Sequence, residues 1–166
     1  MKRTLSCLLA AVLATAASVT LAQETIKIGA PQPMTGPDAP FGDKFKKAYS
    51  LAVDEINASG GVNGKQLELI TRDDNANPGD AVRLAEELVS REKVDVLTGS
   101  FLSHIGLALT DFAKQKKVFF LAGEPLTDKI VWQNGNRYTF RLRPSTYMQV
   151  AMLMPETAAL KKKRWA

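Results

Sequence analysis

One cysteine and one histidine are all that these 166 residues offer for thiol or imidazole chemistry. Cys7 lies in the N-terminal leader described below, so the rest of the chain holds no disulfide and no cysteine-based metal site. The acidic segment Asp73–Asn77 resembles a calcium loop only superficially, because the glycine and the closing glutamate of that motif are missing. We therefore expect no metal ion and no cofactor.

Motifs of nucleotide-binding proteins and hydrolases are also absent. The turn at residues 29–34 is not G-x-G-x-x-G, and no G-x-x-x-x-G-K-[ST] loop occurs. Ser103 and His104 are adjacent, so on a helix their side chains diverge by about 100°. Ser100 and His104 have a spacing at which they could meet, but no G-x-S-x-G turn surrounds either serine. The sequence does not predict an enzyme.

Charge gives no sign of a nucleic-acid partner. Lys and Arg number 22 against 17 Asp and Glu. Two of the basic residues stand in the leader and four in the run from Lys161 to Arg164, which leaves 16 basic against 17 acidic residues. No basic stripe with interleaved aromatic residues exists, so nucleic-acid binding is not expected.

The first 22 residues have the pattern of a secretory signal peptide. Lys2 and Arg3 form a basic start, residues 5–21 are apolar or small, and Thr20–Ala22 precedes a cleavage site ahead of Gln23. A membrane anchor is the alternative, but the segment is rich in alanine and short for a bilayer span. We expect export to the periplasm and a mature chain of 144 residues, 23–166, which is long enough for a core.

Strands and helices are expected to alternate along the mature chain. The strands are predicted at 26–30, 65–72, 94–97, 118–121 and 138–141, and the helices at 41–57, 78–91, 105–112 and 145–160. The proline-rich stretch PQPMTGPDAPFG is expected to be neither helix nor central strand, and Pro155 to kink or divide the last helix. The order predicts an α/β fold whose parallel sheet is covered by helices on both faces, which makes three layers.

The stretch from Val94 to Asp111 predicts a binding pocket. A buried strand ends at Thr98-Gly99-Ser100 and passes into a helix, whose first N–H groups lack partners. Ligands of open α/β sheets bind at this edge. The expected pocket residues are Ser100, Ser103 and His104 on the rim, and Gly123 and Glu124 in the next strand-end loop. As alternatives, Ser103 is a helix cap and His104 a polar first-turn residue.

Four motifs in a fixed order resemble one protein family. They are M-T-G-P at 34–37, F-G at 41–42, A-V-D-E-I-N-A-S-G-G-V-N-G-K at 52–65 and R-D-D-N-A-N-P at 72–78. Together they resemble the N-terminal lobe of periplasmic substrate-binding proteins of branched-chain amino-acid ABC transporters. The resemblance implies two Rossmann-like lobes, each a three-layer arrangement around a parallel sheet, that trap a solute between them and then dock on a membrane permease. Residues 23–166 would be the first lobe of a protein more than twice as long, truncated before its second lobe.

The resemblance also implies roles for single residues. Phe41 matches the aromatic residue that covers the ligand, where tyrosine is usual, and Ser103 matches the serine that holds the ligand carboxylate. The loop after the fourth strand departs from the family pattern, and its Glu124 puts a carboxylate at the pocket. From the residues alone, Phe41 is rather a core or staple residue than a ligand contact, and the alternative for Glu124 is an ion pair with Lys129 or Arg143.

We expect the solute-binding component of an ABC importer, which captures a small amino acid, amide or carboxylate as a monomer and delivers it to the inner-membrane permease. The alternative is a sensor that presents the solute to a membrane receptor without transport. Arg141 and Arg143 are expected to be ion-pair partners rather than ligands of the solute. Because the chain carries half of a pocket, we expect negligible affinity from it alone.

Overall fold

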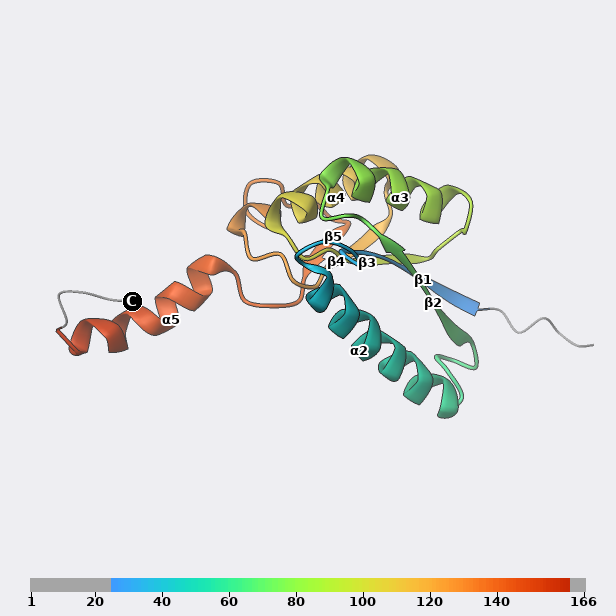
Figure 1. Ribbon diagram of the computed structural model, residues 1–166, viewed down its shortest axis with the longest axis horizontal. Helices are drawn as coiled ribbons and strands as arrows, with labels where there is room; N and C mark the ends of the chain where they lie inside the picture. The colour runs from blue at the N-terminus through green and yellow to red at the C-terminus, as the bar shows by residue number, and fades with distance from the viewer. Residues whose placement is uncertain (1–24, 162–166) are drawn as a thin grey trace, which may run out of the picture.

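The computed structural model describes residues 25–161 (Figure 1). The predicted signal peptide and the basic residues after Lys161 lie outside this range. Five parallel strands form one sheet in the order β2-β1-β3-β4-β5. The strands are β1 (Thr25–Gln32), β2 (Gln66–Asp73), β3 (Val96–Gly99), β4 (Phe119–Ala122) and β5 (Thr139–Arg141). The helices are α2 (Ala39–Ala58), α3 (Pro78–Ser90), α4 (Ser103–Lys116), the short 3₁₀ helix η1 (Asp128–Ile130) and α5 (Thr146–Ala159). The predicted alternation and the α/β class are confirmed.

The hydrophobic core lies between the sheet and the two helices α3 and α4, which cover one face (Figure 1). Helical spacing brings Ala81, Ala85 and Leu88 of α3 onto the sheet, as predicted. Leu97 of β3 and Phe120 of β4 meet them from the strands, and both are almost fully buried. Each large apolar side chain buried in this way contributes about 1.5–3 kcal/mol.

Helix α2 lies on the opposite face of the sheet, so the predicted three-layer arrangement is confirmed, although the described residues cover that face only in part. α2 packs on β2 at one edge, whereas Phe119 of β4 and Phe140 of β5 are 40% and 50% exposed. Their rings stack with centroids 5.2 Å apart. A hollow of about 200 Å³ lies between α2 and the sheet, with Tyr49, Val53 and Leu121 among its lining residues. An apolar run predicts a buried strand, but it does not say which segment covers each face.

The proline-rich stretch is more regular than predicted. Pro31 and Gln32 belong to β1, an interior strand, and α2 begins at Ala39 with Pro40 in its first turn. Pro40 is tolerated because the first N–H groups of a helix need no partner. Pro31 is tolerated because it lies beyond the last paired position of β1 with β3, Gly29 with Leu97, so the ladder does not need the N–H that proline lacks; its carbonyl accepts from the Ser100 N–H at 3.0 Å.

The edge strand β2 is fixed to α2 by a side-chain clasp. Asn57 donates from Nδ2 to the Leu67 carbonyl at 2.9 Å and accepts from the Leu67 N–H at 2.7 Å. Between the two elements, Asn63 and Gly64 both have positive φ, 52° and 79°, as a two-residue hairpin turn requires. The predicted turn and the edge position of β2 are confirmed.

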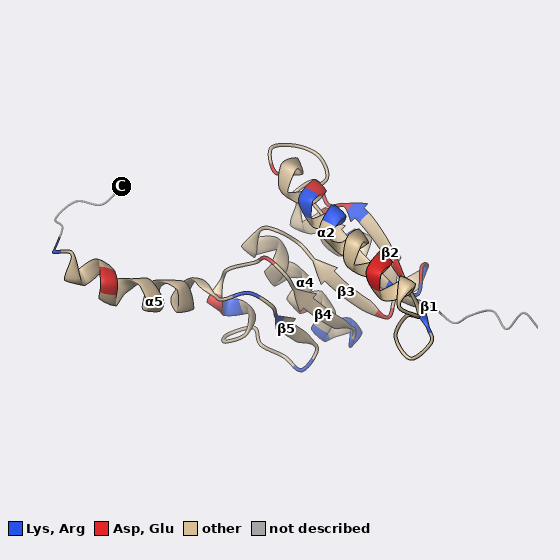
Figure 2. Cartoon of the chain, turned by 90° about the horizontal axis from the view of Figure 1, so that it is seen from below, with Lys and Arg blue, Asp and Glu red and all other residues tan. Residues whose placement is uncertain are grey.

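Helix α5 projects away from the sheet (Figure 1). Ser145 caps it by accepting a hydrogen bond from the Met148 N–H at 3.3 Å. Pro155 is predicted to kink or divide the helix, and division is wrong because the helix continues through it. The carbonyl that loses its partner there lies on an exposed helix. Figure 2 shows almost no charge along it, with Glu156 as the exception within the helix. No described helix is long and apolar enough to cross a membrane.

Candidate functional site

The carboxyl ends of β1, β3, β4 and β5 lie along one edge of the sheet. β1 stands between β2 and β3, so the connections from β1 and from β3 run toward opposite ends of the sheet. Such a reversal leaves a crevice between the two departing loops, and open α/β sheets bind ligands there. The predicted residues follow these strands or begin the next helix, so the structure brings them to one edge.

The turn after β3 has an unusual backbone. Gly99 has a φ of 105°, and a Cβ placed on it would come within 2.5 Å of the Gln32 amide nitrogen. Ser100 follows with a φ of 55°, which is strained for a serine. Its side chain is fully buried, and its Oγ has no hydrogen-bond partner within residues 25–161. Ser100 therefore lies beneath the rim rather than on it.

The start of α4 carries the two other predicted rim residues. The N-cap residue of α4 is Leu102, whose side chain makes no capping hydrogen bond. The alternative that Ser103 caps the helix is therefore wrong. The Ser103 hydroxyl instead accepts hydrogen bonds from the Leu126 and Thr127 N–H groups, both at 3.2 Å. This ties α4 to the loop after β4 and leaves the hydroxyl proton free to donate. His104 is exposed beside it.

An aromatic cluster lies at the same edge. Phe41, in the first turn of α2, is 43% exposed, so it is not a core residue. Its ring stacks on Phe101 with centroids 4.5 Å apart, and Phe45 lies 5.9 Å from Phe101. Sequence reasoning missed Phe101, although its place directly after Ser100 was the available signal.

The loop after β4 has its glycine and its glutamate in different surroundings. The Tyr49 hydroxyl lies 3.1 Å from the position that a Cβ on Gly123 would take, so the glycine leaves room for it. Burial raises the pKa of Tyr49, and the negative charge of Glu124 adds to this, while a hydrogen bond with Thr98 opposes it. Glu124 forms its ion pair with Arg143 and not with Lys129, the other partner considered from the sequence.

Arg141 behaves differently from Arg143. Its guanidinium donates to the carbonyl groups of Pro125, Leu126 and Thr127, so the prediction of an ion pair is wrong for this residue. Burial lowers its pKa, and the charge of Asp128 opposes this. Arg141 thus holds the loop after β4 in place.

Gln32 is a second residue that sequence reasoning missed. It is fully buried at the end of β1, where its side chain approaches the Tyr49 hydroxyl and helps to lower the pKa of that group, although neither of its polar atoms reaches full hydrogen-bond geometry with a described residue. A glutamine at a strand end gives no signal of this kind in the sequence, because its burial depends on Gly99 of another strand.

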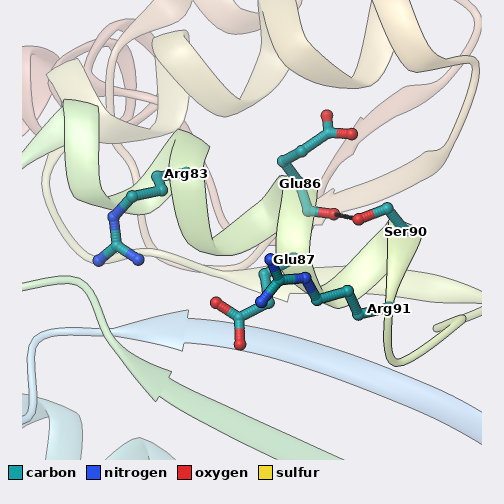
Figure 3. A pocket seen from close by; sticks show the side chains of 5 residues that line it. All are labelled: Arg83, Glu86, Glu87, Ser90 and Arg91. Carbon is teal, nitrogen blue, oxygen red and sulfur yellow. Dashed lines mark hydrogen bonds between the residues drawn. The ribbon is translucent and has the colours of Figure 1, made fainter.

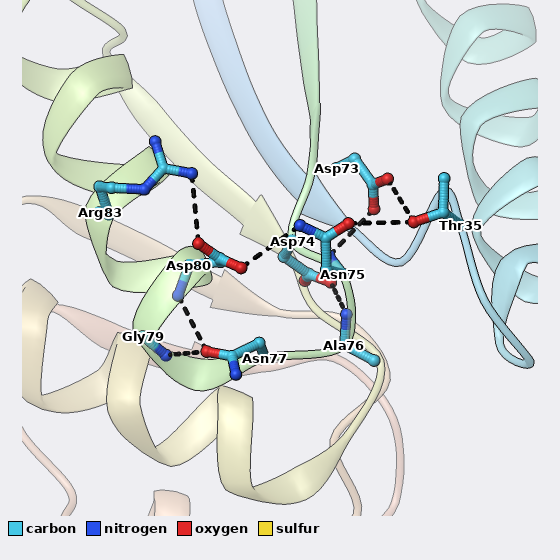
Figure 4. Close-up of polar contacts among 9 residues, drawn as sticks. All are labelled: Thr35, Asp73, Asp74, Asn75, Ala76, Asn77, Gly79, Asp80 and Arg83. Atoms are coloured by element: carbon cyan, nitrogen blue, oxygen red, sulfur yellow. Dashed lines mark hydrogen bonds and ion pairs between the residues drawn. The ribbon is translucent and has the colours of Figure 1, made fainter.

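The acidic loop between β2 and α3 is held by its own hydrogen bonds (Figure 4). Asp73 accepts from the Thr35 hydroxyl at 2.7 Å, the Met34 N–H at 2.9 Å and the Asn75 N–H at 3.0 Å. Burial opposes them, but these bonds lower the pKa of Asp73. Asn77 caps α3 through Gly79 and Asp80, as a helix start requires. No metal-binding group of three or more His, Cys, Asp or Glu residues exists within 25–161.

A hollow of about 360 Å³ on α3 is separate from this edge (Figure 3). Only the C-terminal part of α3 and the residue after it line the hollow, with Arg83, Glu86, Glu87, Ser90 and Arg91. The Ser90 hydroxyl there donates to the Glu86 carbonyl at 2.6 Å. The hollow lies away from the strand ends and is not part of the candidate site.

Known proteins resemble the chain over nearly its whole described length. Residues 25–166 match the periplasmic binding protein family. The leucine-, isoleucine-, valine-, threonine-, and alanine-binding protein of Pseudomonas aeruginosa is 35% identical over 125 residues, which cover 75% of this chain and 33% of that protein.

Two solved structures agree with this match. The branched-chain amino acid transporter substrate binding protein LivJ of Streptococcus pneumoniae, in complex with isoleucine, is 31% identical with a TM-score of 0.68, over 74% of this chain and 34% of that one. An ABC-transporter solute binding protein of Rhodopseudomonas palustris, in complex with 3,4-dihydroxy benzoic acid, is 32% identical with a TM-score of 0.66, over 73% of this chain and 32% of that one. The chain spans about a third of the length of these relatives.

Proposed function

Since this chain belongs to the periplasmic binding protein family, we propose that it is the N-terminal lobe of the solute-binding component of an ABC importer. Family members are substrate-binding proteins rather than enzymes. In this proposal residues 1–22 direct export and are removed, and residues 23–166 form the first lobe. The complete protein works in the periplasm as a monomer and delivers its solute to the inner-membrane permease.

The start of α4 is the observation that carries the proposal. Its first N–H groups and the Ser103 hydroxyl stand at the switch point of the sheet, and a helix N-terminus favours a carboxylate. The ligands named with two relatives, isoleucine and 3,4-dihydroxy benzoic acid, both carry a carboxylate. The stacked rings of Phe41 and Phe101 add an apolar wall for the rest of the ligand. A small amino acid, amide or carboxylate fits this edge.

The other wall of the pocket would come from a second lobe. A half-open edge exposes a bound ligand to water, so each polar contact gains little until a second surface excludes the solvent. Closure of two lobes around the ligand supplies that surface. The chain alone is therefore expected to bind negligibly, and a micromolar affinity measured for it would contradict this arrangement.

The test uses the full-length parent of this chain. A thermal-shift screen with amino acids, amides and aromatic acids first identifies the ligand, and a screen in which nothing binds would overturn the proposal. Ser103→Ala is then expected to lower the calorimetric affinity about 10-fold or more, because a hydrogen bond to a charged group is lost. Ser90→Ala, at the C-terminal end of α3 and away from the strand ends, is the matched control and should leave affinity unchanged. Unchanged affinity in Ser103→Ala would remove this residue from the site. Nothing in residues 25–161 favours the alternative, a sensor without transport.

A further inference from the structure

Glu124 and Arg143 meet because the ends of β4 and β5 are in register. Ala122 of β4 pairs with Arg141 of β5, and the Leu142 N–H donates to the Ala122 carbonyl at 3.0 Å. Two residues beyond each paired position, the Arg143 guanidinium donates through Nη1 to Oε2 of Glu124. The ion pair therefore stands at the carboxyl edge of the sheet, with Arg143 after β5 and Glu124 in the loop whose Leu126 and Thr127 N–H groups donate to the Ser103 hydroxyl.

Most of the bonding capacity of this pair is unused. A guanidinium has five N–H donors and a carboxylate about four acceptor positions. Among the described residues, one donor of Arg143 and one oxygen of Glu124 form a hydrogen bond, and the two side chains remain 39% and 24% exposed. Arg141 already holds the loop through three backbone carbonyl groups. The loop thus has a structural arginine, and Arg143 is available for another task.

Exchange of partners at this pair is energetically easy. A partly exposed ion pair adds little to stability, so its opening costs little. A ligand that offers an ammonium group to Glu124 and a carboxylate to Arg143 replaces both charges at once. Its charge-assisted bonds become stronger when a second lobe excludes water from the edge.

We propose that Glu124 and Arg143 form a recognition pair for a zwitterionic ligand, an inference that rests on the proposed function. Glu124 accepts from the ligand ammonium, and Arg143 turns to the ligand carboxylate, which the N-terminus of α4 also attracts. The pair then discriminates α-amino acids from carboxylic acids that lack the amino group. Neutralising Glu124 removes this discrimination, whereas neutralising Arg143 weakens both kinds of ligand.

The experiment compares matched ligands on the full-length parent. The probes are two amino acids and their counterparts without the amino group, leucine with 4-methylpentanoic acid and phenylalanine with 3-phenylpropanoic acid. Wild type is expected to bind an amino acid at least about 10-fold more tightly than its counterpart. Glu124→Gln should lower amino-acid affinity about 10- to 100-fold and change that of the counterpart less than about two-fold. Arg143→Gln should lower the affinity for both kinds of ligand. Arg143→Lys keeps the charge but loses the planar pair of N–H donors, so its affinities should lie between those of wild type and Arg143→Gln.

The control is the ion pair of Arg72 and Glu92, whose side chains are 33% and 34% exposed and whose N–O distance is 2.7 Å. Arg72→Gln and Glu92→Gln should leave binding unchanged. Equal losses for both ligands in Glu124→Gln, or no loss in any variant of the pair, would show a structural role and overturn this inference. A parent that binds only the acids without the amino group also overturns it, while the proposed function stands. A parent that binds none of the compounds in any screen overturns the proposed function itself.

Discussion

Asp74 provides a stability prediction with a definite sign. The residue is fully buried in the loop between β2 and α3 (Figure 4). One carboxylate oxygen accepts from the Ala76 N–H at 2.9 Å, and the other, Oδ2, has no partner. Burial raises the pKa of Asp74 from 3.8 to about 6, the Ala76 N–H opposes this, and the charges of Asp73, Asp80 and Asp38 add to it.

The raised pKa means that the folded chain holds the proton more tightly than the unfolded chain. The stabilising contribution of this group is therefore fully present below pH 3.8 and is lost as the pH rises through about 6. At pH 7.5 the ionised carboxylate costs at most about 3 kcal/mol relative to a neutral group, and at pH 4.5 about 1 kcal/mol. Asp74→Asn keeps the oxygen that accepts from Ala76 and cannot ionise.

Urea unfolding at several pH values measures this difference. The free energy of unfolding of Asp74→Asn relative to wild type should rise by about 2 kcal/mol between pH 4.5 and pH 7.5. The comparison across pH is the informative quantity, because any packing cost of the amide is the same at both values. A difference that stays constant over this range would refute the reasoning.

The neighbouring Asp73 is a matched control of opposite sign. Its pKa is lowered by hydrogen bonds to the ionised form, so its contribution is present above the unfolded pKa and is lost as the pH falls through the folded one. Asp73→Asn should lower the free energy of unfolding by about 1–3 kcal/mol at neutral pH, and by less at acidic pH. If the stability differences of Asp73→Asn and Asp74→Asn changed with pH in the same direction, the hydrogen bonds assigned to ionised Asp73 would be contradicted.

Two further substitutions test the strand ends and the sheet faces by urea unfolding. Gly99→Ala should lower the free energy of unfolding by about 2 kcal/mol or more, because the φ of Gly99 is 105° and the new Cβ would lie 2.7 Å from the Pro31 carbonyl oxygen. Gly36→Ala, at a φ of 77° with no atom within 4 Å of the new Cβ, should lower it by about 1 kcal/mol. Phe120→Ala should lower the free energy of unfolding by about 3–5 kcal/mol, and Phe119→Ala, on the partly covered face, by about 1 kcal/mol. Equal losses of stability in the two glycine variants would contradict the strained backbone at Gly99. Equal losses in the two phenylalanine variants would contradict the assignment of Phe120 and Phe119 to opposite faces of the sheet.

Local patterns determined most of the secondary structure. Two features depend only on neighbours a few residues away and can therefore be predicted from the sequence. They are the helical spacing of Ala81, Ala85 and Leu88 and the turn at Asn63-Gly64. The same holds for the edge at which the predicted site residues gather, because parallel strands place their carboxyl ends together. The α/β class and the element order followed from these local rules.

Partners distant in the sequence were decided only by the tertiary structure. The choice of Arg143 over Lys129 for Glu124 depends on the register of β4 and β5, and the stacking of Phe101 on Phe41 depends on how α2 approaches β3. The burial of Gln32 and the exposure of Phe119 likewise depend on which segment covers each face. Residue periodicity fixes the direction in which a side chain leaves its own element, whereas its contacts arise from elements brought together by folding, and no local pattern encodes them.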